Sequence, residues 1–322
     1  MNQSRLTPIS ECGLLIAISI LLGAISMYLP ILGTIVEFFW TFPLLVIVVR
    51  HGISRGLISW FAVTILFSLF VGPITAVRMS ISYGAASIAL GFGIIKNFRP
   101  TISIAISMIA GFAAQILTVA ILFFFLDINI ITMQLKLVQE SFDQTFAMYE
   151  SLGVDPKTIS EAKSQINPAL EIVAVIMPLI FTFVAAINTL ISYKAIKWIF
   201  PKIGLGSKII DLPAFKDWRF PSACLYLLAF SLIGLYWGTT RQILPLYQVS
   251  LNVNILTMFI GLFQGMSVVA FFMDWKNISK TIRNIFFIIM FFQLILMEIV
   301  AFIGLFDMIF DYRRRFTEKF RK

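Results

Sequence analysis

The sequence predicts an all-α integral membrane protein, folded as a polytopic helical bundle of eight to nine apolar segments. Of its 322 residues, 59% are hydrophobic and only 13% are charged, whereas an average soluble domain carries about 25% charged residues. The mean hydropathy of +0.94 means that polar groups are too few to cover a surface that faces water. These observations exclude a soluble enzyme, a disordered chain and a fibrous repeat.

A helix needs about 20 apolar residues to span the hydrocarbon of a bilayer. Nine segments are apolar over comparable lengths, and they are residues 12–30, 36–49, 55–73, 75–95, 101–126, 169–196, 221–238, 250–273 and 285–306. Pro43 interrupts the short second segment, so we expect this segment to be tilted or re-entrant. Residues 1–200 hold the first six segments as one predicted core. Residues 201–322 form a predicted C-terminal membrane extension with a basic tail.

Lysine and arginine decide the predicted orientation, because basic connections face the cytoplasm in membrane proteins. With a cytoplasmic N-terminus, the basic connections after the second, fourth, sixth and eighth segments all fall inside. The connection 127–171 falls outside and holds seven acidic residues against three lysines. The sequence therefore predicts a multi-pass protein of the plasma membrane. Nine crossings would leave the arginines at 313–315 outside, so we expect one segment after residue 220 not to cross.

The connection 127–171 has a periodic pattern of its own. Apolar residues recur in it at steps of three and four, which predicts an amphipathic helix with one apolar stripe. The stripe consists of Ile131, Leu135, Val138, Phe142, Phe146 and Tyr149. Asp155 and Pro156 then supply a cap and a first-turn proline for a second short helix. We expect helices within 127–168 on the outer face, either flat on the membrane or capping the bundle.

Residues suited to enzyme chemistry are few. His51 is the single histidine, which removes most metal sites and the usual general base. The stretch 204–208 lacks the spacing of a phosphate-binding loop, and Cys12 and Cys224 stand at the edges of apolar segments. The basic residues are spread over short connections rather than gathered in a domain. The sequence therefore predicts no enzyme, no cofactor, no metal site and no nucleic-acid partner, and it names the lipid bilayer as surroundings.

Small residues form stripes at three- and four-residue steps on several predicted helices. In lipid, helices associate closely where small residues let their backbones approach. The stripes are Gly13 and Ala17, then Ser80, Gly84, Ser87 and Gly91, then Ser103, Ser107, Gly111 and Gln115, and finally Gly261 and Gly265. Each stripe predicts packing within the chain or, as the alternative, a docking face for another protein.

Polar residues at membrane depth are the candidates for a binding site, because a charge at a helix centre costs about 2.5–3.5 kcal/mol on insertion scales. Glu37 and Arg78 are expected at the same outer level. There they either pair, face an anionic or zwitterionic ligand, or snorkel to the interface. Gln115 lies deeper, and Glu171 opens the sixth segment from outside. These four residues form the predicted substrate-binding site.

The order of features in the N-terminal two-thirds is similar to that of a known family. The features are Gly13-Leu14-Leu15-Ile16-Ala17, Tyr28-Leu29-Pro30, Phe42-Pro43-Leu44-Leu45, Arg50-His51-Gly52-Ile53-Ser54-Arg55-Gly56, Gly72-Pro73, Gly91 and Gly93. They resemble the substrate-binding S component of energy-coupling factor (ECF) transporters. The resemblance implies a six-helix core that captures a vitamin-like small solute from outside. It also implies docking onto a T-type membrane subunit through an A-x-x-x-A face, which Gly13 and Ala17 match here, with partner ATPases supplying energy.

A second resemblance lies near the C-terminus. The runs Gly304-Leu305-Phe306-Asp307 and Phe310-Asp311-Tyr312-Arg313 resemble the YybS-like family of uncharacterised bacterial membrane proteins. This resemblance implies a shared fold and no established activity.

Three functions remain open from the sequence. The first is a membrane component that binds a solute, as a subunit of an uptake transporter energised by partner ATPases. The second is a non-transporting membrane regulator or scaffold that retains the same fold. The third is a secondary transporter driven by an ion gradient, with Glu298 as the titrating group. Against it, the sequence shows no pair of broken helices repeated in both halves, as such transporters often have.

Overall fold

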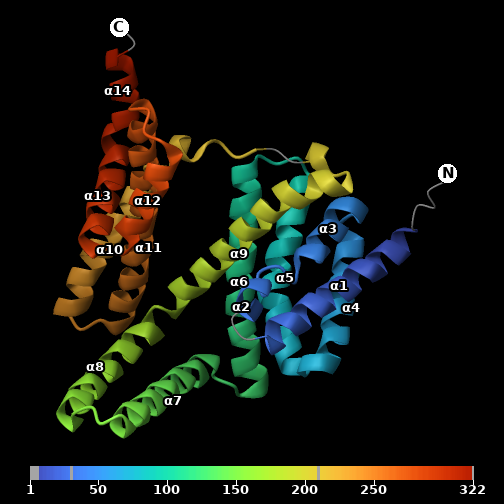
Figure 1. Cartoon of the computed structure of the whole chain (residues 1–322), viewed down its shortest axis with the longest axis horizontal. Helices are drawn as coiled ribbons and strands as arrows, with labels where there is room; N and C mark the ends of the chain where they lie inside the picture. The colour runs from blue at the N-terminus through green and yellow to red at the C-terminus, as the bar shows by residue number, and fades with distance from the viewer. Residues whose placement is uncertain (1–6, 30–31, 209–210, 321–322) are drawn as a thin grey trace. The chain divides into compact units, whose positions relative to one another are not determined.

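The computed structural model describes residues 7–29, 32–208 and 211–320, and every regular element in these ranges is helical (Figure 1). The predicted all-α membrane bundle is confirmed as the fold class. The chain divides into two compact units, residues 1–212 and 213–322, and each is described by itself. The boundary expected from the sequence falls slightly earlier, after residue 200.

Six helices in the described ranges are long and apolar enough to cross a membrane. They are α1 (Pro8–Tyr28), α4 (Ile53–Val71), α5 (Pro73–Ile95), α6 (Pro100–Leu126), α9 (Met177–Ile199) and α11 (Leu244–Trp275). Three further apolar segments are short or bent: α3 (Phe42–His51), α10 (Cys224–Thr240), and the pair α12 (Lys280–Phe291) and α13 (Leu294–Phe310), bent by 112°. The remaining helices are α2 (Leu32–Val36), α7 (Ile130–Ser151), α8 (Pro156–Val175), α14 (Tyr312–Phe320), η1 (Phe200–Ile203), η2 (Gly206–Lys208) and η3 (Phe215–Asp217). Each of the nine predicted apolar segments thus contains helix, but the predicted count of eight to nine membrane segments is not confirmed.

Helix α3 is the buried centre of unit 1. Its residues 42–49 are all buried, and it packs against α1, α4 and α5. A Cβ atom on Gly56 of α4 or on Gly91 of α5 would overlap the side chain of Val48, so both helices approach α3 closely. Pro43 lies in the first turn of α3, where its missing N–H costs nothing. The predicted interruption of this segment is present, but it falls in the turn 37–41, and Pro43 opens α3 rather than breaking a helix.

Helix α2 and the turn 37–41 connect α1 to α3. Helix α2 folds back onto α1 so closely that a Cβ atom on Gly33 would overlap the carbonyl oxygen of Ser26. At 1.5 Å per residue, α3 measures only about 15 Å, roughly half of the hydrocarbon thickness. The second predicted segment is therefore a broken helix, made of α2, a turn and α3.

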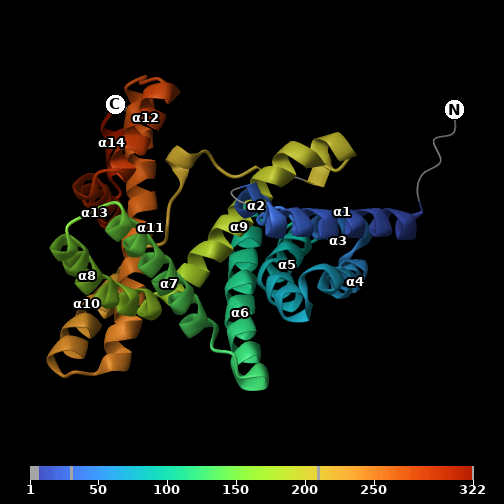
Figure 2. The same ribbon diagram turned by 60° about the horizontal axis from the view of Figure 1, so that its bottom comes forward.

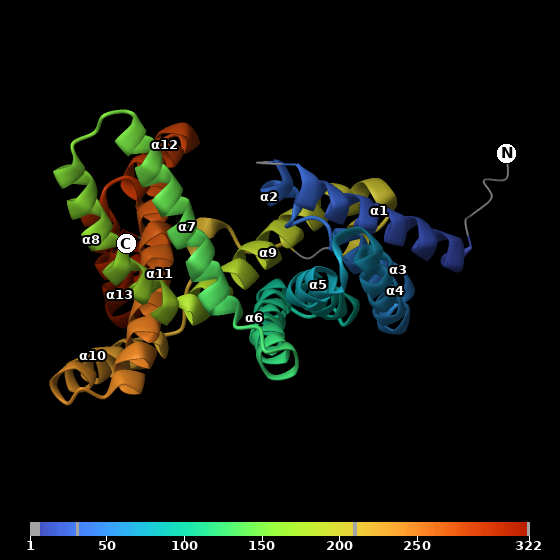
Figure 3. The same ribbon diagram turned by 90° about the horizontal axis from the view of Figure 1, so that it is seen from below.

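Helix α5 stands between α4 and α6, as Figure 3 shows from below. Its small-residue stripe meets partners within the chain, since a Cβ atom on Gly84 would overlap the Trp60 ring of α4. On α6, the Ser107 hydroxyl donates to a carbonyl of α5 and shares a hydrogen bond of 2.9 Å with Thr189 of α9. The stripes on α5 and α6 therefore serve packing inside this chain.

The connection 127–171 consists of the helical hairpin α7–α8, whose two helices lie side by side (Figure 2). Lys163 of α8 forms an ion pair with Glu150 of α7 over 3.4 Å. Helix α8 is longer than the short helix expected, and it includes Glu171. The sixth apolar segment instead begins at Met177 of α9.

Helix α11 is the axis of unit 2 and packs against both α10 and α13. Gly261 and Gly265 of α11 face Gly304 of α13. A Cβ atom on Gly304 would overlap the carbonyl oxygen of Gly261, so the two backbones are in direct contact. The predicted stripe on α11 therefore also serves packing within the chain.

The bent pair α12–α13 begins and ends at the same end of α11. Helix α12 begins at Lys280, shortly after α11 ends at Trp275. Helix α14, which follows α13, places the Phe316 ring edge-on against Trp275, with ring centroids 4.7 Å apart. A pair bent in this way is either a broken span or a re-entrant loop. The expectation that one segment after residue 220 does not cross therefore stays a prediction.

A cysteine at position 152 should report on which side of the membrane the hairpin α7–α8 lies. Leu152 is 70% exposed between the two helices, so Leu152→Cys should react with a membrane-impermeant maleimide on intact cells, with buried Cys12 and Cys224 replaced by Ala. The matched control is Lys96→Cys, in a connection predicted to face the cytoplasm, which should react only after permeabilisation. The reverse pattern would invert the predicted orientation.

Replacing Gly265 by Val should destabilise unit 2, because a Cβ atom there would overlap the carbonyl oxygen of Val300. Overpacking costs about 1–3 kcal/mol, so the thermal unfolding midpoint in detergent should fall by at least about 2 °C. Gly13→Val is the control, since a Cβ atom on Gly13 meets nothing within 4 Å. An unchanged midpoint for Gly265→Val would contradict the backbone contact between α11 and α13.

Candidate functional site

Glu37 is held by a buried tyrosine of α5. It is half-buried in the turn before α3, and its Oε1 accepts a hydrogen bond from the Tyr83 hydroxyl over 2.8 Å. The Phe38 ring packs edge-on against Tyr83, with ring centroids 6.2 Å apart. Because Tyr83 is itself buried, the Glu37 carboxylate has a fixed position on the side of α5.

The turn that carries Glu37 lies alongside the middle of α5. Fully buried Thr41 shares a hydrogen bond of 2.7 Å with Ser87, and Glu37 reaches Tyr83. Glu37 is therefore not at the outer level expected from the sequence, because the short α3 brings the preceding turn about half-way along the bundle. Irregular backbone at membrane depth is tolerated where protein covers it or where it lines a cavity. Trp40 in this turn is 0% exposed, so protein covers part of it.

Arg78 lies on α5 five residues before Tyr83 and is half-buried. Five residues of helix correspond to about 7.5 Å, which is the separation of Arg78 and Tyr83 along the axis of α5. No carboxylate of the described residues lies within ion-pair distance of Arg78. Arg78 therefore does not pair with Glu37, and its guanidinium N–H groups form no ion pair with a described carboxylate.

Gln115 reaches the same part of α5 from α6. Its Oε1 accepts a hydrogen bond from the Ser82 hydroxyl over 3.1 Å. Ser82 follows Arg78 by four residues and so lies on the same face of α5. Three of the four predicted site residues, Glu37, Arg78 and Gln115, therefore converge on one stretch of α5.

Ser82 and Tyr83 escaped the sequence prediction, although they bind two of the predicted residues. Both are uncharged residues on a helix rich in small residues, and an uncharged residue gives no electrostatic sign of a site. The one available signal was a tyrosine within the small-residue stripe of α5, since a buried tyrosine hydroxyl usually has a hydrogen-bond partner.

Glu171 does not join the other predicted site residues. Its side chain is exposed on α8, a helix whose main contact is with α7. Within the described ranges, no hydrogen bond or ion pair connects Glu171 to Glu37, Arg78 or Gln115. The sequence prediction placed it at the entrance of the site because it assigned residue 171 to the span that α9 forms.

The predicted docking residues Gly13 and Ala17 are both exposed on α1. A Cβ atom on Gly13 would meet nothing within 4 Å. Unlike the stripes on α5, α6 and α11, this pair of small residues is not covered by the described part of the chain.

A second polar cluster joins α1, α3 and η1. Glu11 of α1 accepts hydrogen bonds from Arg50 and His51, the second over 3.1 Å. Arg50 also donates to the carbonyl oxygen of Ile203. The hydrogen bond to Glu11 places His51 in this cluster, which joins α1 to α3.

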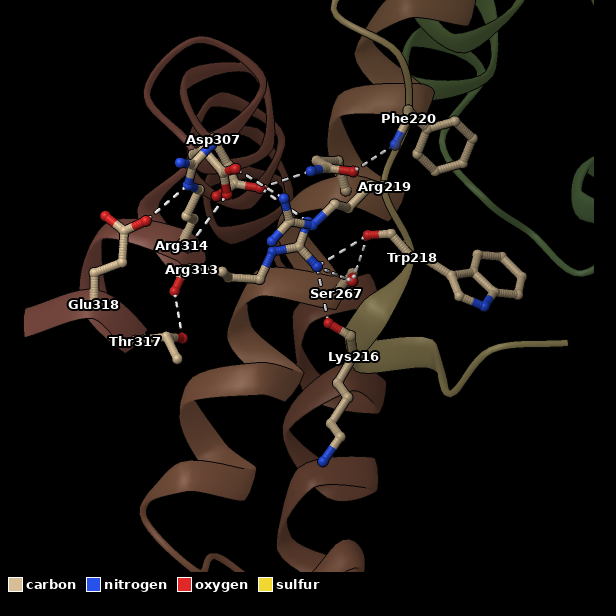
Figure 4. A network of polar contacts seen from close by, with 12 residues as sticks. Lys216, Trp218, Arg219, Phe220, Ser267, Asp307, Arg313, Arg314, Thr317 and Glu318 are labelled. Atoms are coloured by element: carbon tan, nitrogen blue, oxygen red, sulfur yellow. Dashed lines mark hydrogen bonds and ion pairs between the residues drawn. The ribbon is translucent and has the colours of Figure 1, made fainter. Parts of the chain in front are cut away.

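Unit 2 contains a buried ion pair that links α13 to α14 (Figure 4). Arg313 donates to Asp307 Oδ2 over 3.0 Å, and the two side chains are only 3% and 2% exposed. Gln264 of α11 donates to the same oxygen over 2.6 Å, and its own Oε1 accepts from the backbone N–H of Phe220. Asp307 Oδ2 thus accepts from both Arg313 and Gln264, and Gln264 also binds the segment before α10.

Arg313 also binds the chain segment that contains η3. It donates to the carbonyl oxygens of Lys216 and Trp218 over 2.8 and 2.9 Å, and to the Ser267 hydroxyl over 3.0 Å. Removing one partner of a buried pair leaves an uncompensated charge. We therefore assign this network to the stability of unit 2.

This network was not predicted from the sequence. Arg313 was expected on a basic tail with Arg314 and Arg315, whereas the structure buries Arg313 and leaves Arg314 and Arg315 exposed. Asp307 and Arg313 both belong to the C-terminal runs of the second resemblance, but no role followed for them. A basic residue six positions after an acid in an apolar helix was the available signal.

Residues 17–308 match the family described as "Predicted membrane protein (DUF2232)". The chain belongs to this family. The chain is also similar to "Uncharacterized protein YybS" of Bacillus subtilis (strain 168), with 25% identity over 325 residues. The alignment covers 98% of this chain and 99% of the relative. No solved structure matches this chain. The YybS-like resemblance is thus confirmed, and the ECF S-component resemblance stays a prediction.

The DUF2232 match includes the three residues that converge on α5. It also includes Asp307 but ends before Arg313, and it begins after Gly13. The family is described as a membrane protein, which agrees with the six long apolar helices of the described structure.

Neutralising one member of the buried pair should destabilise the protein more than neutralising both. Asp307→Asn and Arg313→Met should each cost about 3–5 kcal/mol, since each leaves the other charge buried alone. The double variant should regain part of this loss. Arg314→Met is the control, because Arg314 and Glu318 form an exposed pair worth at most about 1 kcal/mol. Strictly additive losses in detergent thermal unfolding would show that the pair is not coupled.

Proposed function

We propose that unit 1 of this membrane protein binds a small anionic or zwitterionic solute, as the solute-binding component of an uptake transporter. The observation that carries the proposal is the half-buried Arg78, which has no ion-pair partner among the described residues and lies on α5, the helix that also holds the Glu37 carboxylate through Tyr83. A charge in a membrane helix usually has a partner or a task, and Arg78 lacks the partner.

The broken helix α2–α3 supports a binding role for this region. In membrane transporters, binding sites lie where helices are interrupted near mid-depth, and half-helix N-termini carry a partial positive charge. The turn before α3 lies beside the middle of α5, as its bonds to Tyr83 and Ser87 show. A solute bound beside this turn would meet the N-terminus of α3.

The side chains suit a solute with an anionic group. The planar guanidinium of Arg78 can donate two parallel hydrogen bonds to a carboxylate or phosphate. The Glu37 carboxylate can accept from an ammonium or hydroxyl group of the same solute. Gln115 uses its carbonyl oxygen on Ser82, so its amide N–H groups can face the solute.

The proposal extends to partner subunits through the first helix. The exposed face of α1 at Gly13 and Ala17 has room for another helix to approach closely. By its resemblance to an S component, this face would contact a T-type membrane subunit, and partner ATPases would supply the energy.

A second candidate function is a non-transporting regulator or scaffold. The specific observation in its favour is that Glu37 and Gln115 both have partners within the chain, so they can be explained as packing polar groups. The third alternative, an ion-driven transporter that titrates Glu298, has less support because Glu298 is exposed on α13.

Replacing Arg78 by Ala should remove solute binding while leaving the fold nearly intact. The measurement is the thermal unfolding midpoint of the purified protein in detergent, with and without a pool of small metabolites. Ligand at 100 times its Kd stabilises a protein by about 2.7 kcal/mol, so the wild type should gain several degrees and Arg78→Ala should gain none. The control is Arg99→Ala, which removes an exposed arginine and should keep the full gain.

The same measurement separates binding from scaffolding. If Glu37 and Tyr83 have only a packing role, Glu37→Gln and Tyr83→Phe should lower the midpoint without the pool, and Arg78→Ala should respond to the pool as the wild type does. That result would remove Arg78 from the site and favour the scaffold.

A further inference from the structure

An open groove of about 610 Å³ lies in unit 2 beside the C-terminal end of α11. Its walls are apolar and come from three helices: Val269 and Phe272 from α11, Ile303 from α13, and Phe316 from α14. Phe316 packs edge-on against Phe272, with ring centroids 4.9 Å apart. The groove is therefore formed within one unit, by α14 packing against the end of α11.

The rim of this groove is basic. Lys276, Arg315 and Lys319 line it, and all three side chains are exposed. The neighbouring acids already have other partners: Asp274 pairs with Lys216, Asp307 with Arg313, Asp311 with Arg219, and Glu318 with Arg314. Over residues 213–320, no carboxylate lies within ion-pair distance of the three rim cations. The rim is thus an uncompensated cluster of positive charge above an apolar groove.

The groove lies where a long apolar helix ends. Helix α11 is a candidate membrane span that ends at Trp275, and tryptophan is enriched at membrane–water interfaces. The Lys276 ammonium lies over the Trp275 ring, 4.8 Å from its centroid. The apolar walls therefore extend along the span, whereas the cations lie at the level of the lipid headgroups.

We propose that this groove binds an anionic phospholipid, with its phosphate at Lys276, Arg315 and Lys319 and one acyl chain along the apolar walls. The charge of the rim matches the headgroup and the walls match the chain. Basic residues next to a membrane helix attract the anionic lipids of the cytoplasmic leaflet, the side on which the sequence places Lys276. This site is separate from the solute site proposed in unit 1.

The test measures lipid binding to the full chain in detergent by native mass spectrometry. Dioleoylphosphatidylglycerol and dioleoylphosphatidylcholine share the same acyl chains, and the first should bind about tenfold more tightly or better because of the rim. The triple variant Lys276→Gln, Arg315→Gln, Lys319→Gln should lose this preference. Its matched control, Lys136→Gln, Lys157→Gln, Lys163→Gln, removes the same charge from the hairpin α7–α8 and should keep it.

Two further arms test the groove and the source of the phosphate. Ile303→Trp should fill the groove and weaken phosphatidylglycerol binding with the rim intact, while its thermal midpoint confirms folding. Millimolar inorganic phosphate should not displace the lipid if the acyl chain contributes. Equal affinity for the two lipids, an unaffected triple variant, or displacement by inorganic phosphate would each overturn the proposal.

Discussion

Close contact between helix backbones is the constraint on which both units depend. Lipid provides no hydrophobic force between helices, so they associate where small residues let backbones approach. In unit 1, Val48 of α3 fits against Gly56 and Gly91, and in unit 2, Gly304 of α13 touches Gly261 of α11. These contacts position the polar groups near them, namely the turn before α3 and the ion pair that links α13 to α14. A larger side chain at either contact would therefore disturb polar interactions several residues away.

The helices and most of their packing could be predicted from the sequence, because hydropathy and small-residue stripes are local patterns. The stripes that include Gly84 and Gly261 pack as such patterns indicate. The depth of Glu37 could not be predicted, because it was counted from the end of a segment assumed to cross the whole membrane. The structure interrupts that segment before Pro43, so residues on its two sides have different depths from those expected.

The polar contacts were harder to predict because their partners are distant in sequence. Arg313 binds carbonyl oxygens at 216 and 218 and a serine at 267, and nothing in the sequence around 313 indicates such partners. The convergence of Arg78 and Gln115 on α5 followed from correct helix assignments. The contacts of Gln115 with Ser82 and of Glu37 with Tyr83 depend on helix rotation, which hydropathy alone does not fix.

The break between α2 and α3 has a consequence for how the protein is made. A ten-residue apolar helix is too short to span the bilayer alone, and the turn before it carries the polar side chains of Glu37 and Thr41. The turn finds its hydrogen-bond partners on α5, at Tyr83 and Ser87, which leave the ribosome some forty residues later by chain order. Residues 32–51 should therefore stay at the translocon or the membrane surface during synthesis, and enter the bilayer only together with the helical hairpin formed by α4 and α5.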